Sequence, residues 1–359
     1  MKAGASERAY QMQKLRSLLI EIPKTEIHLH LEAMASVDTI WALMKKHSIS
    51  YEEISSKDDL KKKFQVTSLN EFIDLFINVI QNCFRAEDDI DLLIEDARGY
   101  LTRNNIVYSE IFFSPSKFLL NGLTFEGIID RLESGSNSLK SASNLDTSFI
   151  IDVSRSFGME NAMNNLDYTL QNRSDAIIGI GLGGAETTGP AKEYTKVFEK
   201  AAAEGLHVVA HAGEDVGPES IWDAIKLLGV ERIGHGISAI QDEELLDYLK
   251  ENAVPLEICP TSNLFTQKYV KVLEEHPIRA FFDRGLNVTV NTDDPTLFGI
   301  DLVDEYMRLA NRGFFKPDEI IDLVKNNVFA TFLPKKQKTA LWKSAQKIIS
   351  SYSAELEIA

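Results

Sequence analysis

The sequence predicts a single (β/α)8 TIM barrel domain over residues 1–359, with a helical insertion after the first strand and extra C-terminal helices. The chain has 359 residues, of which 44% are hydrophobic and 26% charged, a composition typical of globular proteins. Short apolar runs rich in β-branched residues alternate with helical stretches along the chain. This alternation is typical of βαβ units in a parallel sheet, and eight such units close a barrel.

Eight apolar runs are the expected strands, and a polar or glycine-rich break follows each of them. They lie at residues 25–32, 106–115, 147–154, 176–184, 207–214, 232–236, 255–263 and 287–295. The stretches between them are expected to be helical. The clearest are 190–204, which opens with Pro190 and ends before Gly205, and 241–251, whose first turn is acidic.

The connection between the first and second expected strands is far longer than the others. Apolar residues recur in it at helical spacing, namely Leu69, Phe72, Phe76, Val79, Ile80 and Cys83. We expect this helix to form a lid over the barrel mouth, with Phe72 and Phe76 packed in the core or, as the less favoured alternative, stacked on a substrate ring. After the last strand, helices are expected at 302–310 and 318–329, and the stretch to about Tyr352 is expected to pack outside the barrel.

Charge and cysteine content narrow the class of protein. The formal net charge is −16, which disfavours nucleic acid or an anionic membrane surface as a partner. No run of about 18 apolar residues occurs, and the first twenty residues lack the pattern of a signal peptide. With only two cysteines, Cys83 and Cys259, a reducing cytoplasm is expected. The choice between a monomer and a homo-oligomer stays open.

Ionisable side chains gather at the carboxyl ends of the expected strands, where barrel enzymes place their chemistry. They are His28 and His30 on the first strand, His211 and Glu214 on the fifth, His235 on the sixth, and Asp293 and Asp294 on the eighth. Because the eighth strand closes next to the first, we expect these residues to meet at one mouth.

A zinc site is the favoured interpretation of the first pair. His28 and His30 are two apart on a strand, so both imidazoles face the same side. The alternative is a pair of hydrogen-bonded core histidines, which would be costly to bury. His211 and Asp293 are the best candidates for the other ligands of a catalytic zinc. One ion per subunit is expected, because the fourth strand carries no lysine that could bridge two metals.

Three further residues are catalytic candidates, each with a structural alternative. Glu214 could donate a proton if burial raised its pKa, or it could satisfy the N–H groups at the start of a helix. His235 could assist a water molecule at the metal, or be a structural histidine. Asp294 could orient or accept substrate, or cap the turn. Gly184 could let a substrate ring lie against the backbone, or simply form a tight turn.

The sequence resembles the adenosine/adenine deaminases of the amidohydrolase superfamily. The motifs that carry the resemblance are PKTEIHLHLE (23–32), GIGLGGAE (179–186), HAGE (211–214), RIGHG (232–236), CPTSN (259–263) and NTDDP (291–295). They follow the order of that family and span nearly the whole barrel. The resemblance implies a zinc-dependent hydrolase that removes ammonia from a small-molecule purine.

The resemblance also implies a role for each matched residue. Zinc would be held by His28, His30, His211 and Asp293. Glu214 would protonate N1 of the purine while water attacks C6, with His235 assisting deprotonation of the water and holding the oxyanion. Asp294 would accept a hydrogen bond on the N7 side, and the Gly184 backbone would contact N3.

Two departures bear on the substrate. Glu32-Ala33 follows the His-x-His-Leu motif where adenosine-specific members usually carry Asp-Gly. This glutamate looks more like the adenine deaminases and some relatives that act on other adenine-containing compounds. The motifs at 259–263 and 291–295 look closer to nucleoside deaminases. His30 and Glu32 are expected to contact the substrate, and Glu32-Ala33 leaves the group beyond the purine ring open.

Adenosine or deoxyadenosine is therefore the expected substrate. The alternatives are free adenine and a 5′- or N6-modified adenosine such as aminodeoxyfutalosine. Another metal-dependent hydrolase and a non-catalytic nucleoside-binding barrel are more remote. A deaminase acting on nucleic acid is disfavoured, because its zinc motifs are absent.

Overall fold

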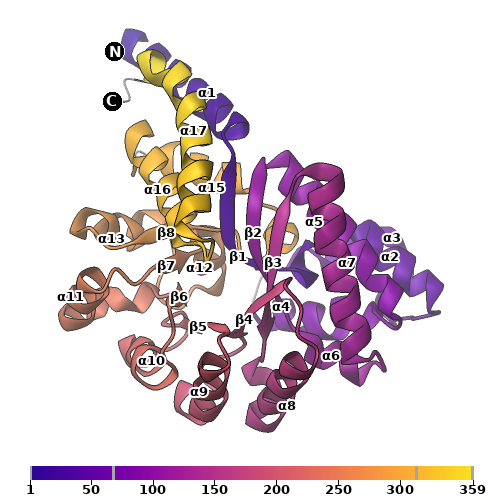
Figure 1. Ribbon diagram of the computed structural model, residues 1–359. Coiled ribbons are helices and arrows are strands. Elements are labelled where there is room, and N and C mark those ends of the chain that lie inside the picture. Colours follow the sequence, from indigo (N-terminus) through magenta and orange to yellow (C-terminus); the bar gives the residue numbers. More distant parts are fainter. Residues whose placement is uncertain (1, 67–68, 312–313, 357–359) are drawn as a thin grey trace.

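The computed structural model describes residues 2–66, 69–311 and 314–356, and it forms a parallel barrel surrounded by helices (Figure 1). Eight strands pair in sequence order, each parallel to the next. The strands are β1 (Lys24–His30), β2 (Ile106–Phe113), β3 (Asp146–Asp152), β4 (Ile177–Leu182), β5 (His207–Ala212), β6 (Arg232–His235), β7 (Leu256–Ile258) and β8 (Val288–Val290). The predicted fold class and the eight predicted strands are confirmed.

The barrel closes where the chain after β8 runs beside β1. The backbone N–H of His30 donates to the carbonyl oxygen of Asp293 at 3.1 Å, and that of Asp293 donates to the carbonyl oxygen of His28 at 3.2 Å. An isolated parallel bridge joins Leu29 to Asp293. The closing seam of the barrel therefore lies at three of the expected metal ligands.

Several strands end earlier than expected. β7 ends at Ile258, and residues 260–263 instead begin helix α12 (Pro260–Thr266), because Pro260 at its first position favours a helix start. Glu214, Asp293 and Asp294 lie just beyond the ends of β5 and β8. They are therefore loop residues at the barrel mouth, where active-site residues of this fold gather.

Helices form the outer layer and the connections of the barrel. They are α1 (Lys2–Glu21), α2 (Val37–Lys46), α3 (Lys57–Lys63), α4 (Leu69–Asp74), α5 (Ile90–Arg103), α6 (Pro115–Leu120), α7 (Phe125–Ser143), α8 (Gly158–Gln171), α9 (Thr195–Ala203), α10 (Pro218–Asp223), α11 (Glu243–Glu251), α12, α13 (Ile278–Arg284), α14 (Pro295–Phe298), α15 (Leu302–Asn311), α16 (Pro317–Ala330) and α17 (Lys335–Leu356). The helices predicted at 190–204, 241–251, 302–310 and 318–329 correspond to α9, α11, α15 and α16.

The insertion between β1 and β2 is helical, as expected, but it is not one regular helix. After α4 the chain continues as a π-helical segment, η2 (Leu75–Ile80), and a short 3-10 turn, η3 (Gln81–Cys83).

Helix α1 was not predicted from its polar sequence. It packs beside α17, and the two helices extend beyond the barrel (Figure 1).

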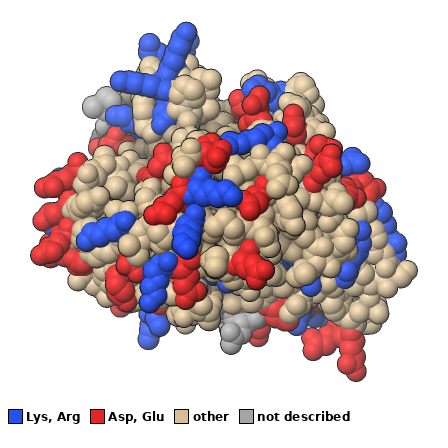
Figure 2. Space-filling view, turned by 60° about the horizontal axis from the view of Figure 1, so that its bottom comes forward, with Lys and Arg blue, Asp and Glu red and all other residues tan. Residues whose placement is uncertain are grey.

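The surface carries both signs of charge. On the face shown in Figure 2, lysine and arginine side chains lie among aspartate and glutamate side chains. Among residues 2–66, 69–311 and 314–356, no helix combines the length and hydropathy needed to cross a bilayer.

Candidate active site

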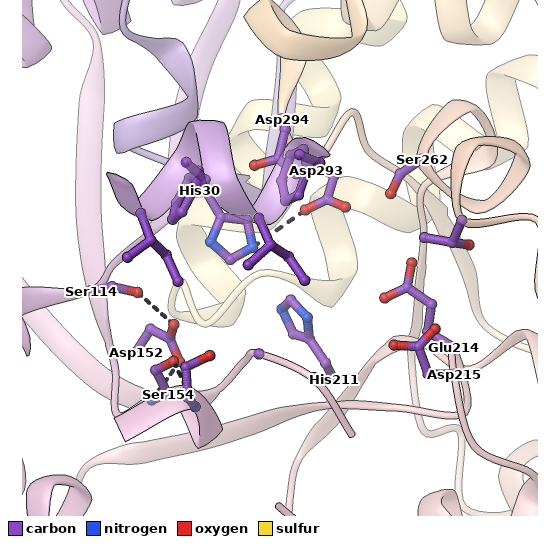
Figure 3. Close-up of a pocket in the computed structure, with 18 of the residues that line it drawn as sticks. His30, Ser114, Asp152, Ser154, His211, Glu214, Asp215, Ser262, Asp293 and Asp294 are labelled. Atoms are coloured by element: carbon purple, nitrogen blue, oxygen red, sulfur yellow. Dashed lines mark hydrogen bonds and ion pairs between the residues drawn. The ribbon is translucent and has the colours of Figure 1, made fainter. Parts of the chain in front are cut away.

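A cavity of about 970 Å³, including its opening to solvent, lies at the carboxyl ends of the strands. Most of the residues expected to carry the chemistry line it: His30, His211, His235, Glu214, Asp293 and Asp294. Figure 3 shows the side chains of His30, His211, Glu214, Asp293 and Asp294 around the same space. His28 lies beside them and is fully buried.

The expected zinc ligands form a compact donor cluster. Nitrogen atoms of His28, His30 and His211 all lie within 4.8 Å of one another. Oδ1 of Asp293 is 3.3 Å from Nε2 of His30 and 3.5 Å from Nε2 of His28. Nε2 of His28 and Nε2 of His211 are buried without a hydrogen-bond partner among the described residues. Buried unpaired nitrogens next to a carboxylate are a donor set that fits zinc.

A buried carboxylate that the sequence did not single out supports this cluster. Glu257 on β7 accepts a hydrogen bond from Nδ1 of His28 at 2.7 Å, which leaves Nε2 of His28 free to face a metal. Its other oxygen lies 2.5 Å from Nε of Arg232. Arg232 also pairs with Glu110 at 2.5 Å. A carboxylate behind a ligating imidazole orients the ring and raises its basicity.

The backbone around Glu214 is held by another buried carboxylate. Glu186 accepts hydrogen bonds from the backbone N–H groups of Gly213 at 2.9 Å, Glu214 at 2.8 Å and Asp215 at 3.2 Å. It also accepts one from the hydroxyl of Ser220 at 2.6 Å. The carboxylate that satisfies the backbone N–H groups of this turn is thus Glu186, and the side chain of Glu214 lines the cavity instead.

Glu214 has the electrostatic surroundings of a proton donor. Burial first, and then the nearby carboxylates of Asp293 and Asp215, raise the pKa of Glu214 well above its usual range. Its Oε2 lies 3.3 Å from Nε2 of His235. A carboxyl group kept neutral in this way can deliver a proton to a bound base.

His235 and Asp293 both have left-handed backbone conformations, with φ of 61° and 65°. Residues other than glycine rarely adopt this conformation, and it is concentrated at functional sites. Gly236 follows His235 with a φ of 70°, and its N–H donates to the carbonyl oxygen of Ala212 at 3.1 Å. The His235 ring lies at the metal cluster, with its centroid 4.9 Å from that of His28 and 5.0 Å from that of His211.

Asp294 and Gly184 both line the cavity. Burial first, and then the charge of Asp293, raise the pKa of Asp294 well above its usual range. Gly184 has a φ of +83°, and a Cβ atom there would lie 3.0 Å from the Oγ of Ser156. The left-handed backbone therefore favours glycine, which leaves the backbone bare toward the cavity.

Glu32 is placed differently from the other predicted residues. It is fully buried, and it is not among the residues that line the cavity. One of its oxygens accepts hydrogen bonds from Nε2 of Gln81 at 3.1 Å and from the backbone N–H of Ser114 at 2.9 Å. Since Gln81 and Ser114 line the cavity, Glu32 supports the wall from behind.

A polar shelf, formed by Ser114, Asp152 and Ser154, lies across the cavity from Glu214 (Figure 3). The hydroxyl of Ser114 donates to Asp152 at 2.5 Å, and the backbone N–H groups of Ser154 and Gly183 donate to the same carboxylate at 2.9 and 2.8 Å. Sequence analysis missed these residues, although they lie at the carboxyl ends of two predicted strands.

The insertion forms an apolar wall. Phe72, Ile73, Phe76 and Ile77 line the cavity with Phe265 and Phe298. The ring of Phe72 stacks on those of Phe76 and Phe298, with centroids 5.8 and 5.7 Å apart. Phe72 and Phe76 also pack against the main core, as the favoured interpretation expected, and their stacking on a substrate ring stays a prediction.

The other histidines lie outside the metal cluster. His47 pairs with Asp89 at 2.7 Å, and His207 pairs with Glu231 at 2.9 Å. Cys259, expected in the core, is fully buried. His276 is buried and hydrogen bonds to Asn263.

The model of the adenosine deaminase family matches residues 23–348. The chain belongs to this family. It is 33% identical to an aminodeoxyfutalosine deaminase of Streptomyces avermitilis, over 92% of each chain. It is also 33% identical to an adenine deaminase of Psychrobacter cryohalolentis, over 88% of this chain and 94% of that one. Among solved structures, an adenine deaminase from Arthrobacter aurescens superimposes with a TM-score of 0.85 and 29% identity, covering 92% of this chain and 99% of that one.

Membership of this deaminase family determines the reaction class. The protein is a hydrolytic deaminase that acts on a small purine of the adenine type. The cluster of histidines and aspartate supports a metal cofactor. The relatives act on different adenine compounds, so family membership alone does not select the substrate.

Proposed function

We propose that this protein is a zinc-dependent deaminase of a neutral adenine nucleoside, converting adenosine or deoxyadenosine and water to the inosine form and ammonia. The observation that carries the proposal is the continuity of one cavity. It joins Glu214, His235 and Asp294 to the polar shelf of Ser114, Asp152 and Ser154. A free base would engage the first group alone, whereas a nucleoside also presents sugar hydroxyls to the second.

One zinc ion per subunit would be held by His28, His30, His211 and Asp293, with Glu257 orienting His28. Bound there, zinc would supply Lewis acidity, lowering the pKa of water from about 15.7 to about 7. The fit rests on the unpaired Nε2 atoms of His28 and His211.

The chain's own residues supply the remaining steps. Glu214, kept protonated by burial, donates its proton to N1 of the purine, which makes C6 electrophilic enough for water to attack. His235, which lies beside Glu214, interacts with the oxygen of the attacking water. Asp294 accepts a hydrogen bond on the N7 side, and the bare backbone at Gly184 receives the N3 edge. The attacking water gives up two protons, of which one returns to Glu214 and the other goes to the amino group. The C6–N bond then breaks, and the amino group leaves as ammonia.

The charge of the lining argues for an uncharged substrate. No lysine or arginine occurs among the described residues that line the cavity. A phosphate or carboxylate on the substrate would therefore be desolvated without an opposite charge. Aminodeoxyfutalosine, which bears a carboxylate, is disfavoured on this ground.

A second candidate is an adenosine with an uncharged apolar 5′-substituent. The apolar wall of Phe72, Phe76, Phe265 and Phe298 favours it, because the shelf alone would satisfy a plain ribose. Free adenine, which Glu32 suggested, would leave both the shelf and this wall without a partner.

An ammonia-release screen tests the proposal. Zinc-loaded protein would be assayed with adenine, adenosine, deoxyadenosine, N6-methyladenosine, apolar 5′-substituted adenosines and aminodeoxyfutalosine. We expect the largest kcat/KM with adenosine or deoxyadenosine. Preferential consumption of adenine or of the carboxylate-bearing compound would overturn the assignment, and binding without turnover of any compound would indicate a non-catalytic barrel.

The cytoplasm is the compartment that we propose. Cys83 and Cys259 are both free and buried, which suits a reducing environment.

A further inference from the structure

We propose that Asn263 and His276 are positioning residues that hold His235 in the tautomer protonated at Nε2. The three side chains form a hydrogen-bonded relay behind the active site. Asn263 is on α12, and His276 lies two residues before α13. Asn263 and His276 do not line the cavity, so neither touches substrate.

The relay begins at the backbone N–H of Ile278, a group that can only donate. The backbone N–H of Ile278 donates to Nδ1 of His276 at 3.1 Å, so this nitrogen must be an acceptor. Burial lowers the pKa of His276 to about 3, so its ring is neutral and the proton is on Nε2.

The orientation of the next amide follows from this tautomer. Nε2–H of His276 faces Oδ1 of Asn263 at 3.3 Å, where the oxygen can accept. Nδ2 of Asn263 must then point the other way, and it lies 3.1 Å from Nδ1 of His235. If the amide of Asn263 were flipped, its NH2 group would face the Nε2–H of His276, and both groups would be donors.

The tautomer of His235 is the last link. Its Nδ1 accepts from Asn263, so the neutral ring carries its proton on Nε2. The groups around Nε2 are compatible with this assignment. Oδ2 of Asp293, an ionised carboxylate that can only accept, lies at 3.9 Å, and Oε2 of the neutral Glu214, which can accept as the carbonyl oxygen of its carboxyl group, lies at 3.3 Å. His235 therefore presents an N–H donor to the attacking oxygen, and a proton gained at Nδ1 would break the relay.

His235 thus acts by hydrogen-bond donation and not by deprotonation of water. The kinetic consequence of this role rests on the proposed deamination, but the tautomer itself does not. The isosteric change Asn263→Asp reverses the relay, because a carboxylate can only accept. We expect His235 to move its proton to Nδ1 in that variant and to lose the donor at Nε2.

Long-range ¹H–¹⁵N spectra of metal-free enzyme labelled with [¹⁵N]histidine measure the tautomer without substrate or turnover. We expect an unprotonated Nδ1 for His235 in the wild type and an unprotonated Nε2 in Asn263→Asp. In steady-state assays of the zinc enzyme, kcat of Asn263→Asp should fall roughly 10²-fold, with KM within about threefold of the wild type. Asn165→Asp, an equally buried asparagine on α8 outside the cavity, is the matched control.

A second pair of variants keeps the test independent of how Asn263→Asp folds. His276→Leu removes the donor to Asn263 and should lower kcat about tenfold, whereas His276→Gln, which keeps an N–H there, should restore most of it. An Nδ1–H tautomer in the wild type would overturn the proposal, as would kcat values for Asn263→Asp and His276→Leu close to that of the wild type. If no adenine compound is deaminated at all, the spectra alone decide between the two tautomers.

Discussion

Glu257 accepts the Nδ1–H of His28 at 2.7 Å, and both side chains are fully buried. The contact links the metal cluster to a buried ion-pair chain through Arg232 and Glu110. Its strength comes from a charged acceptor that is buried away from solvent.

Glu257→Gln is expected to weaken zinc binding by about 10–100-fold, because the imidazole of His28 loses a charged partner. Competition against a chromophoric chelator measures the dissociation constant. Glu305→Gln removes an equally buried carboxylate that accepts a hydrogen bond from the backbone N–H of Thr261, and it should leave zinc affinity near that of the wild type. If zinc affinity fell equally in both variants, the loss would reflect the removal of any buried charge and not the contact between Glu257 and His28.

Metal removal should abolish turnover reversibly. Dialysis against a chelator is expected to remove activity, and one equivalent of zinc per chain should restore it, because His28, His30, His211 and Asp293 form a single cluster. Metal analysis together with titration of activity measures the stoichiometry. Full activity in metal-free protein, or a requirement for two ions, would contradict this expectation.

Glu214→Gln should lower kcat by about 10³-fold or more while zinc content and substrate affinity are retained, because the amide cannot donate the proton that N1 needs. Steady-state kinetics and metal analysis test both halves of the prediction. Glu219→Gln, at an exposed carboxylate on the nearby α10, is the control. Near-normal turnover in Glu214→Gln would remove Glu214 from the mechanism.

The pH profile should report the protonated form of Glu214. Because this acid works only when protonated, kcat/KM should fall as pH rises through its elevated pKa. Asp215→Asn removes a negative charge that raises this pKa, so the ionised form becomes easier to reach and the alkaline limb should move to lower pH. An unchanged limb, or one displaced to higher pH, would assign it to another group.

Glu186→Gln should loosen the turn that carries Glu214. The amide keeps only one oxygen to accept from the N–H groups of Gly213, Glu214 and Asp215, and a buried donor without a partner costs roughly 1–3 kcal/mol. Thermal unfolding should shift to lower temperature, and kcat should fall more than zinc affinity does. A lower Tm with unchanged kcat would limit Glu186 to a structural role.

Much of the site could be predicted because strand geometry is regular. The i, i+2 spacing of His28 and His30 places them on one face of β1, and chain order places His211 and His235 on adjacent strands. Ser114 and Asp152 carried the same positional signal and could have been predicted too. Glu257 gave no such signal, since one glutamate in an apolar strand does not reveal which side chain it meets.

The sequence by itself determined the barrel, the cluster of ionisable residues at its mouth and the deaminase family, because alternating patterns and motifs are local properties of the chain. The tertiary structure alone decided which buried partners hold those residues. Glu257 behind His28, Glu186 beneath Glu214 and Asn263 behind His235 are distant in sequence. Hydrogen bonds between them depend on distances and angles that only the closed barrel sets.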